Sequence, residues 1–267
     1  MVWYNTATMF AWTMQWLVLF FYTVFTGMLL VSLDANVIVV MLLLTVAPLI
    51  VMWRQAALQL WLVPVIVLIS VAFTAFLQIF AYLNGLWYEI GPSHLRVFEL
   101  FPVEAFLASF IQVLYFIVIY EYFFDDQATS QTITTRKWHP VLIATLTITS
   151  LAFAYLSLFS GVFFSYPYAI LLVVLGLLAA AALAFAHRNW RSVLRKTSSF
   201  ALAALPLSLV YQFVLLENEL RFFANVNEYL ATFSVFGHPI PLEELLLTLL
   251  IPYWVAMLYE LYLDDGK

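Results

Sequence analysis

Long apolar stretches separated by short polar segments make up almost the whole of this chain. A helix that crosses the hydrocarbon core of a membrane needs about 20 mostly apolar residues. Within each stretch the apolar residues run on continuously, whereas a transmembrane barrel would alternate apolar and polar positions. The stretches that meet or approach this length are Met9–Leu33, Asn36–Trp53, Ala56–Leu83, Pro102–Phe124, Pro140–Ser160, Pro167–Ala186, Lys196–Leu216 and Pro239–Leu263. The pattern predicts an all-α, polytopic transmembrane helical bundle of eight spans, or of seven if the short second stretch is re-entrant.

The composition also favours a membrane environment. Hydrophobic residues make up 66% of the 267 positions and charged residues only 9%, whereas a soluble domain carries about 25% charged residues. The net charge of −5 gives no basic footprint for nucleic acid. There is no cysteine, which excludes thiolate chemistry and cysteine-based metal sites. The first apolar stretch lacks a basic segment before it, so we expect a span there and no cleavable signal peptide.

Arginine and lysine positions predict the orientation, because cytoplasmic loops of membrane proteins are enriched in both. With eight spans, most of the basic residues fall on one side of the membrane. These are Arg54, Arg136, Lys137, Arg188, Arg191, Arg195, Lys196 and Lys267. Only Arg96 and Arg221 fall on the other side. We therefore expect an integral protein of the plasma membrane with both termini in the cytoplasm.

Two stretches of the chain match at an offset of 139 residues with no gap. The matched positions are Pro102 and Pro241, Glu104 and Glu243, Tyr120-Glu121 and Tyr259-Glu260, Asp125-Asp126 and Asp264-Asp265, and also Glu89 and Glu228. The offset predicts two membrane repeats, residues 1–133 and 134–267, of about four helices each. An even number of spans gives both repeats the same orientation, and a site is then expected where they meet.

The duplicated Pro-x-Glu motif has a structural and a functional interpretation. Proline suits the first turn of a helix, and a glutamate in that turn is favoured by the helix dipole. However, Glu243 and Glu244 are adjacent in a chain with almost no charge, and ionisable residues held near lipid are candidates for function. A carboxyl group that keeps its proton there could act as a general acid. Both interpretations stay open for Glu104, Glu243 and Glu244.

The Tyr-Glu motif lies at the far end of the same two predicted helices. Glu121 is about 25 Å along the helix from Glu104, so these two carboxylates cannot share a site. Tyr120 and Tyr259 fit an aromatic belt at the membrane interface, and the aspartate pairs fit solvated helix ends. We expect a structural role for this set.

These motifs resemble those of the membrane-integral lycopene cyclase domain family, in which two similar small domains occur as separate subunits or fused in one chain. Phe101-Pro-Val-Glu-Ala-Phe106 and Ile240-Pro-Leu-Glu-Glu-Leu245 carry the resemblance, and the segments that begin at Asn84 and Asn227 fit more loosely. The remaining spans match only as generic membrane helices. Ala105 stands where the family usually has a second glutamate, so the two copies are not equivalent.

The resemblance implies an isomerase, specifically an intramolecular lyase that cyclises the acyclic ends of lycopene or a related carotenoid into ionone rings. It assigns the acid–base chemistry to Glu104, Glu243 and Glu244. The implied partners are an apolar carotenoid and the lipid bilayer, with no nucleic acid. No motif demands a cofactor or a metal, and the oligomeric state stays open, a homo-oligomer included. The alternatives are a transporter or carrier of apolar solutes and a non-catalytic carotenoid-binding or assembly protein.

Overall fold

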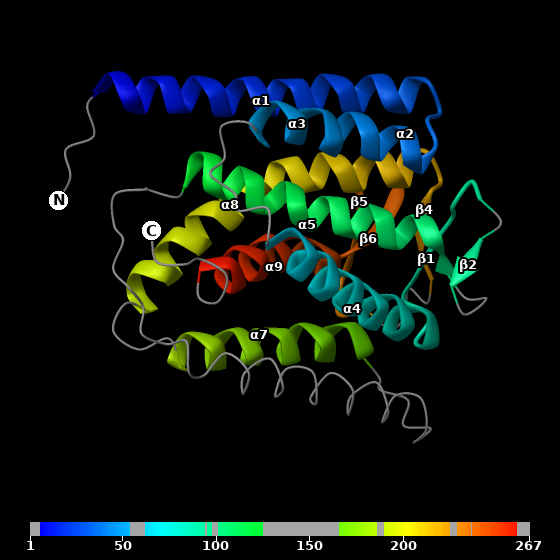
Figure 1. Cartoon of the computed structure of the whole chain (residues 1–267). Coiled ribbons are helices and arrows are strands. Elements are labelled where there is room, and N and C mark those ends of the chain that lie inside the picture. The colour runs from blue at the N-terminus through cyan, green and yellow to red at the C-terminus, as the bar shows by residue number, and fades with distance from the viewer. Residues whose placement is uncertain are drawn as a thin grey trace.

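The computed structural model describes residues 6–53, 62–93, 95–97, 101–124, 166–185, 190–224, 229–235 and 237–260, and these residues are mostly helical. The helices lie roughly side by side, and the strands gather at one end of the molecule, on the right in Figure 1. We call this the strand end. The opposite end, where α5 and α9 finish, is the far end.

The first two predicted spans form helices with nearly the expected bounds. Helix α1 covers Thr6–Ser32. Three segments then follow one another without a break, namely α2 (Val37–Met41), the π-helical turn η1 (Leu42–Val46) and α3 (Ala47–Trp53). Asn36 caps α2, because its side chain accepts hydrogen bonds from the N–H groups of Ile38 and Val39 at 3.1 Å.

Two segments of the chain are built in the same order, a helix followed by strands and a second helix. The first unit comprises α4 (Leu62–Leu83), β1 (Trp87–Glu89), β2 (Arg96–Val97), β3 (Phe101–Pro102) and α5 (Val103–Phe123). The second unit comprises α8 (Trp190–Glu217), β4 (Arg221–Phe223), β5 (Thr232–Val235), β6 (His238–Pro241) and α9 (Leu242–Leu258). Helix α7 (Pro167–Phe185) precedes the second unit.

The strands form three small antiparallel sheets, which the all-α prediction did not include. β2 pairs with β3 and β5 with β6 inside their units, whereas β1 pairs with β4 and joins the two units. Pro102 and Pro241 precede α5 and α9 in an extended conformation, and the backbone before them satisfies its polar groups in ladders.

Two predicted boundaries were wrong for local reasons. The predicted span Pro239–Leu263 begins with a strand, because its first residues pair with β5, and α9 starts only at Leu242. Helix α8 begins at Trp190, so Arg191, Arg195 and Lys196 belong to the helix rather than to a loop. Arginine and lysine are good helix formers, which accounts for the extension. The predicted span Pro140–Ser160 and both Asp-Asp pairs lie outside the described residues.

Three helical segments are long and apolar enough to cross a membrane, namely Ala11–Ser32, Val103–Phe123 and Trp190–Glu217. Val37–Trp53, Ala72–Leu83 and Pro167–Leu177 are shorter apolar helices. Large apolar side chains face outward, such as Phe25 at 73% and Val51 at 71% exposure. Outward apolar faces suit a lipid environment. The membrane prediction is therefore supported by apolar helices, and the count of eight spans stays a prediction.

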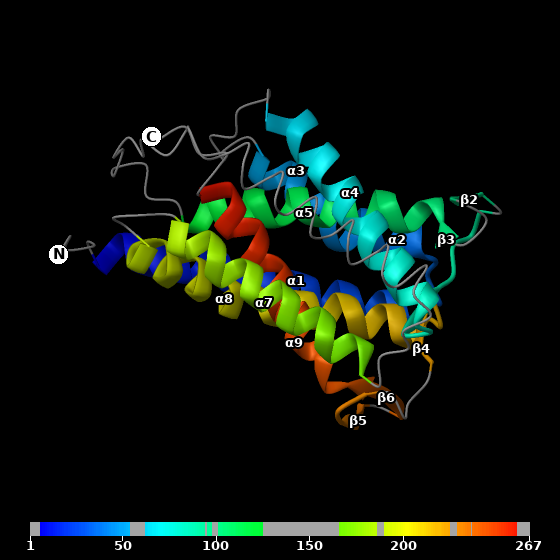
Figure 2. The same ribbon diagram turned by 90° about the horizontal axis from the view of Figure 1, so that it is seen from below.

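Helix α5 lies at the centre of the packing. Its residues Leu114–Tyr120 are all buried, which means that the helix is surrounded on every side over two turns. It packs on α3, α4 and α9, while α9 packs on α7 and α8. Figure 2 shows α3, α4 and α5 on one side of the bundle and α7 and α8 on the other. The two units therefore meet along α5 and α9.

Candidate functional site

Both units leave their first helix through the same kind of turn. The segments Asn84-Gly85-Leu86 and Asn218-Glu219-Leu220 lie 134 residues apart. The central residue of each is left-handed, with φ 62° at Gly85 and 53° at Glu219. In each turn the leucine N–H bonds to the carbonyl oxygen five residues earlier, at 2.9 and 2.8 Å. This is the Schellman motif, which ends a helix and sends the chain back across it.

After these turns β1 and β4 pair in an antiparallel sheet, in which Glu89 lies opposite Arg221. Arg221 Nε lies 3.9 Å from Glu89 Oε1. The guanidinium carbon lies 4.9 Å from the centre of the Trp87 ring and 5.5 Å from that of Phe223. A buried arginine is thus held between two aromatic faces, where cation–π attraction favours its charge.

A carboxylate from α9 completes the surroundings of Arg221. Arg221 Nη1 lies 3.0 Å from Glu244 Oε1 and donates to Gln212 Oε1 at 2.8 Å. Tyr168 of α7 donates a hydrogen bond to Glu244 Oε2. Burial opposes the charge of Arg221, but Glu244 and then Glu89 outweigh it and raise the pKa of the guanidinium. Arg221 is therefore a permanently charged group inside the protein.

Glu104 and Glu243 fasten the start of their helices to the chain that precedes them. Glu104 Oε1 accepts from the N–H of Ser93 at 2.8 Å, and Glu243 Oε1 accepts from the N–H of Leu230 at 2.6 Å. Both helices follow a proline cap with the same extended backbone. The second oxygen of each carboxyl is buried and has no hydrogen-bond partner within the described part of the chain. A Cβ on Gly91 would lie 2.5 Å from Glu104 Oε2, so only glycine fits there.

A cavity of about 90 Å³ lies between the two units. Its lining includes Glu104 and Ala105 of α5, Glu244 and Thr248 of α9, and Arg221 of β4. Further lining residues form matched pairs, one from each unit. The pairs are Thr74 and Ser208, Gln78 and Gln212, and Ser109 and Thr248.

The cavity is matched in these three polar pairs and unmatched at Gln112, which corresponds to Ile251, and in its charged residues. Ala105 of the first unit occupies the position of Glu244 in the second. By position in the strands, Trp87 corresponds to Arg221 and Glu89 to Phe223. The charged residues Glu89 and Arg221 therefore occupy positions that do not correspond between the two units. The pairing of β1 with β4 brings them together.

The structure brings two of the three predicted site residues together. Glu104 and Glu244 both line the cavity, although they lie in different units. Glu243 is fully buried against the turn at Leu230 and is not among the described residues that line the cavity. No three His, Cys, Asp or Glu residues in the described ranges converge where a metal ion could bind.

Sequence reasoning did not assign roles to Tyr168, Gln212, Glu89 or Arg221 in this site. A signal was present, because the glutamines at 78 and 212 interrupt apolar spans and lie 134 residues apart. The motifs match at an offset of 139, whereas these glutamines match at 134. The two offsets differ because the segment between β4 and α9 is five residues longer than the segment between β1 and α5. The predicted match of Glu89 with Glu228 stays a prediction, because Glu228 lies outside the described residues.

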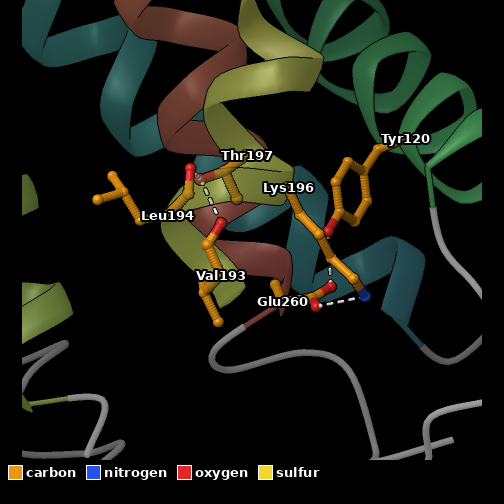
Figure 3. A network of polar contacts seen from close by, with 6 residues as sticks. All are labelled: Tyr120, Val193, Leu194, Lys196, Thr197 and Glu260. Atoms are coloured by element: carbon orange, nitrogen blue, oxygen red, sulfur yellow. Dashed lines mark hydrogen bonds and ion pairs between the residues drawn. The ribbon is translucent and has the colours of Figure 1, made fainter. Parts of the chain in front are cut away.

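At the far end the duplicated Tyr-Glu motifs bond to one another. Tyr120 donates to Glu260 Oε2 at 2.8 Å, and Tyr259 donates to Glu121. Figure 3 shows Tyr120 and Lys196 converging on Glu260, with Lys196 Nζ 3.1 Å from Oε1. The structural role that we expected for this set agrees with these contacts. The aromatic-belt interpretation was wrong, because both tyrosines are buried inside the protein, where the carboxylates satisfy their hydroxyl groups.

Taken together, the described residues define a mostly helical protein with apolar helices able to span a membrane and a charged cavity where two similar units meet. Comparisons with protein-family models, curated proteins and solved structures find no match for this chain.

Proposed function

We propose that this protein is a membrane-embedded carotenoid cyclase that converts an acyclic end of lycopene or a related carotenoid into an ionone ring. One observation carries the proposal. Glu104, from the first Pro-x-Glu motif, and Glu244, which directly follows the second, line the same cavity. Two carboxyl groups in different environments can divide the acid and base roles of one reaction.

The proposed reaction starts with Glu104. Glu104 lines the cavity, and its buried Oε2 has no hydrogen-bond partner among the described residues, so a proton carried there is free to be transferred. The proton adds to the terminal double bond, and the resulting tertiary cation is attacked by the neighbouring double bond, which closes the ring. Glu244 then removes a proton from the ring, and exchange with water returns a proton to Glu104. Atoms and electrons balance, so the reaction is an isomerisation that needs no redox partner.

The groups around Arg221 have separate roles in this proposal. Trp87 lies beside the cavity, and its ring face can stabilise a developing carbocation. Arg221 and Tyr168 hold the Glu244 carboxyl in place from two directions. Glu243, by contrast, positions the start of α9 through its bond to Leu230.

The cavity volume sets a condition on substrate binding. About 90 Å³ corresponds to about three waters at roughly 30 Å³ each. A branched end group of a carotenoid is larger, so binding must displace water and move lining side chains. We place the acyclic end at the cavity and the rest of the polyene between helices and lipid.

The proposal includes the finer topology predicted from the sequence. We propose eight spans in two parallel repeats, residues 1–133 and 134–267, with both termini in the cytoplasm of a cell whose plasma membrane holds the protein. The matched turns, strands and cavity residues of the two units support the duplication. Reporter fusions after residues 92 and 236 should lie outside, and those after residues 127 and 188 should lie inside. A reporter pattern with an odd number of spans would contradict it.

The function is tested by expressing the chain in a bacterium that accumulates lycopene and separating the pigments by chromatography. We expect monocyclic or bicyclic carotenes with the unchanged chain. Glu104→Gln and Glu244→Gln should lose ring formation, whereas Glu243→Gln should retain it. Glu217→Gln is the matched control, because Glu217 pairs with His238 away from the cavity. The proposal would be overturned if lycopene stayed unchanged in this host and hydroxylated acyclic carotenoids stayed unchanged in hosts that accumulate them, with the protein present in the membrane.

A second candidate is a carotenoid-binding or carrier protein without catalysis. Two observations favour this candidate. Glu244 is already bonded to Arg221 and Tyr168, and Ala105 stands in place of a second glutamate in the first unit. Such a protein would purify with bound but chemically unchanged pigment. The glutamine variants would then alter pigment retention without altering pigment structure.

A further inference from the structure

Three residues that line the cavity carry buried polar atoms without a hydrogen-bond partner in the part of the chain that the structure describes. Glu104 Oε2, Trp87 Nε1 and Thr248 Oγ1 make no hydrogen bond among the described residues, and their side chains line the cavity. The three residues are only 8%, 3% and 4% exposed. A buried polar group without a partner costs about 1–3 kcal/mol, and such groups are rare in native structures.

The three atoms differ in what they need. The tryptophan N–H can only donate, the threonine hydroxyl can donate and accept, and a carboxyl oxygen can accept, or donate when it carries the proton. A hydroxyl group donates one hydrogen and accepts two, so it can serve a donor and an acceptor together. A pure hydrocarbon end would leave all three atoms without a partner.

The neighbouring side chains have the same character. Gln78 and Gln112 also line the cavity, so amide groups as well as hydroxyl groups surround the bound molecule. Ser109 and Thr74 extend this polar wall on the side of the first unit. A cavity shaped only for an alkene would be lined by apolar and aromatic side chains.

We propose that the cavity binds the hydroxyl-bearing end of an otherwise apolar molecule in preference to a pure hydrocarbon end. Within the proposed function, on which the identity of the polyene rests, this means that a hydroxylated acyclic carotenoid binds more tightly than lycopene. The preference itself rests on the cavity wall. Sites built to bond a hydroxyl group reject the analogue that lacks it, because their polar groups are then left unpaired.

The experiment measures binding directly. The full-length protein, purified in detergent, is mixed with equal amounts of lycopene and its derivative with an allylic hydroxyl group on one terminal methyl carbon, which keeps the terminal double bond. Free pigment is removed by size exclusion, and the retained pigments are quantified by chromatography. Satisfying one unpaired group should enrich the hydroxylated pigment about tenfold.

Matched threonine variants locate the effect. Thr248→Val removes the unpartnered cavity hydroxyl and should bring the ratio close to one, without lowering the melting temperature. Thr197→Val makes the same change on α8, where the hydroxyl donates to the carbonyl of Val193 at 2.8 Å. This control should melt earlier and keep the preference. Trp87→Phe provides a second cavity variant, which removes the N–H group and keeps an aromatic face.

Each outcome decides the inference. A hydroxyl preference that Thr248→Val or Trp87→Phe weakens supports it. Equal retention of both pigments, a preference for lycopene, a preference that both cavity variants leave unchanged, or retention of neither pigment overturns it. Retention of the hydroxylated pigment without ring formation in cells would support the binding site and contradict the cyclase proposal, so the two failures are distinguishable.

Discussion

The two ends of α5 and α9 carry the same duplicated motifs and use them in different ways. At the far end the exchange is reciprocal, with Tyr120 bonded to Glu260 and Tyr259 bonded to Glu121. At the strand end the copies have diverged, and Ala105 stands opposite Glu244 across a cavity. Matched residues thus bond the two units to each other, whereas mismatched residues create the charged site.

The difference has a physical cause. A tyrosine hydroxyl and a carboxylate satisfy one another, so the far end leaves little for a ligand to bind. At the strand end one arginine is shared between Glu89 and Glu244, and other polar atoms remain without partners within the described residues. The matched residues therefore form a structural contact at the far end, whereas the mismatch at the strand end leaves a candidate binding site.

The largest effect should come from removing the shared cation. Arg221→Met leaves Glu244 and Glu89 without their partner and should destabilise the protein by about 3–5 kcal/mol. The raised pKa of Arg221 keeps its contribution fully present below the ordinary arginine pKa, and it is lost only as the pH rises beyond that value. The loss, followed as the melting temperature in detergent, should thus be the same throughout the neutral range.

Two variants control for this change. Arg191→Met removes an exposed arginine from the same helix bundle and should change the melting temperature little. Adding Glu244→Gln to Arg221→Met should restore part of the lost stability, since no unpaired charge then remains at that position. A double variant no more stable than Arg221→Met would contradict the ion-pair account.

Making the two copies alike at the strand end should have the next largest effect. Ala105→Glu places a carboxyl at a buried position that has Trp87, and not an arginine, in the corresponding strand position. The unpaired group should cost about 2 kcal/mol or more. Ala105→Ser is the control, because its small hydroxyl fits the polar cavity. Equal melting temperatures for both variants would show that the asymmetry is unimportant for stability.

The far end should respond symmetrically. Tyr120→Phe and Tyr259→Phe each remove one hydrogen bond to a carboxylate, which is worth about 1.5–3 kcal/mol. We expect similar decreases in melting temperature and no change in the pigment preference of the cavity. A large difference between the two variants would break the comparison, because it would mean that the exchange is not reciprocal in energy.

The smallest effects should come from the matched turns, and their signs should be opposite. Gly85→Ala places a side chain at φ 62° and should cost about 1 kcal/mol, whereas Glu219→Gly relieves φ 53° and should stabilise the protein by up to about 1 kcal/mol. Chemical denaturation in detergent can resolve both. Destabilisation by Glu219→Gly would mean that its side chain has a role beyond the turn.

Several features could be predicted from the sequence because they depend on local rules. The apolar runs determined where helices form, and prolines before Glu104 and Glu243 determined where α5 and α9 begin within two residues of the described helices. The matched motifs also pointed to the two units that the structure builds in the same order. These features follow from periodicity and from the missing N–H of proline, which act over a few residues.

Only the tertiary structure decided which residues share the site. The pairing of β1 with β4 brings Glu89 to Arg221, and the contact of α5 with α9 brings Glu104 to the same cavity as Glu244. Both contacts join segments more than a hundred residues apart, through a loop whose changed length shifts the repeat register. The sequence by itself determined the helices and the candidate carboxyl groups, while packing separated Glu243, which fastens a turn, from Glu104 and Glu244, which face the cavity.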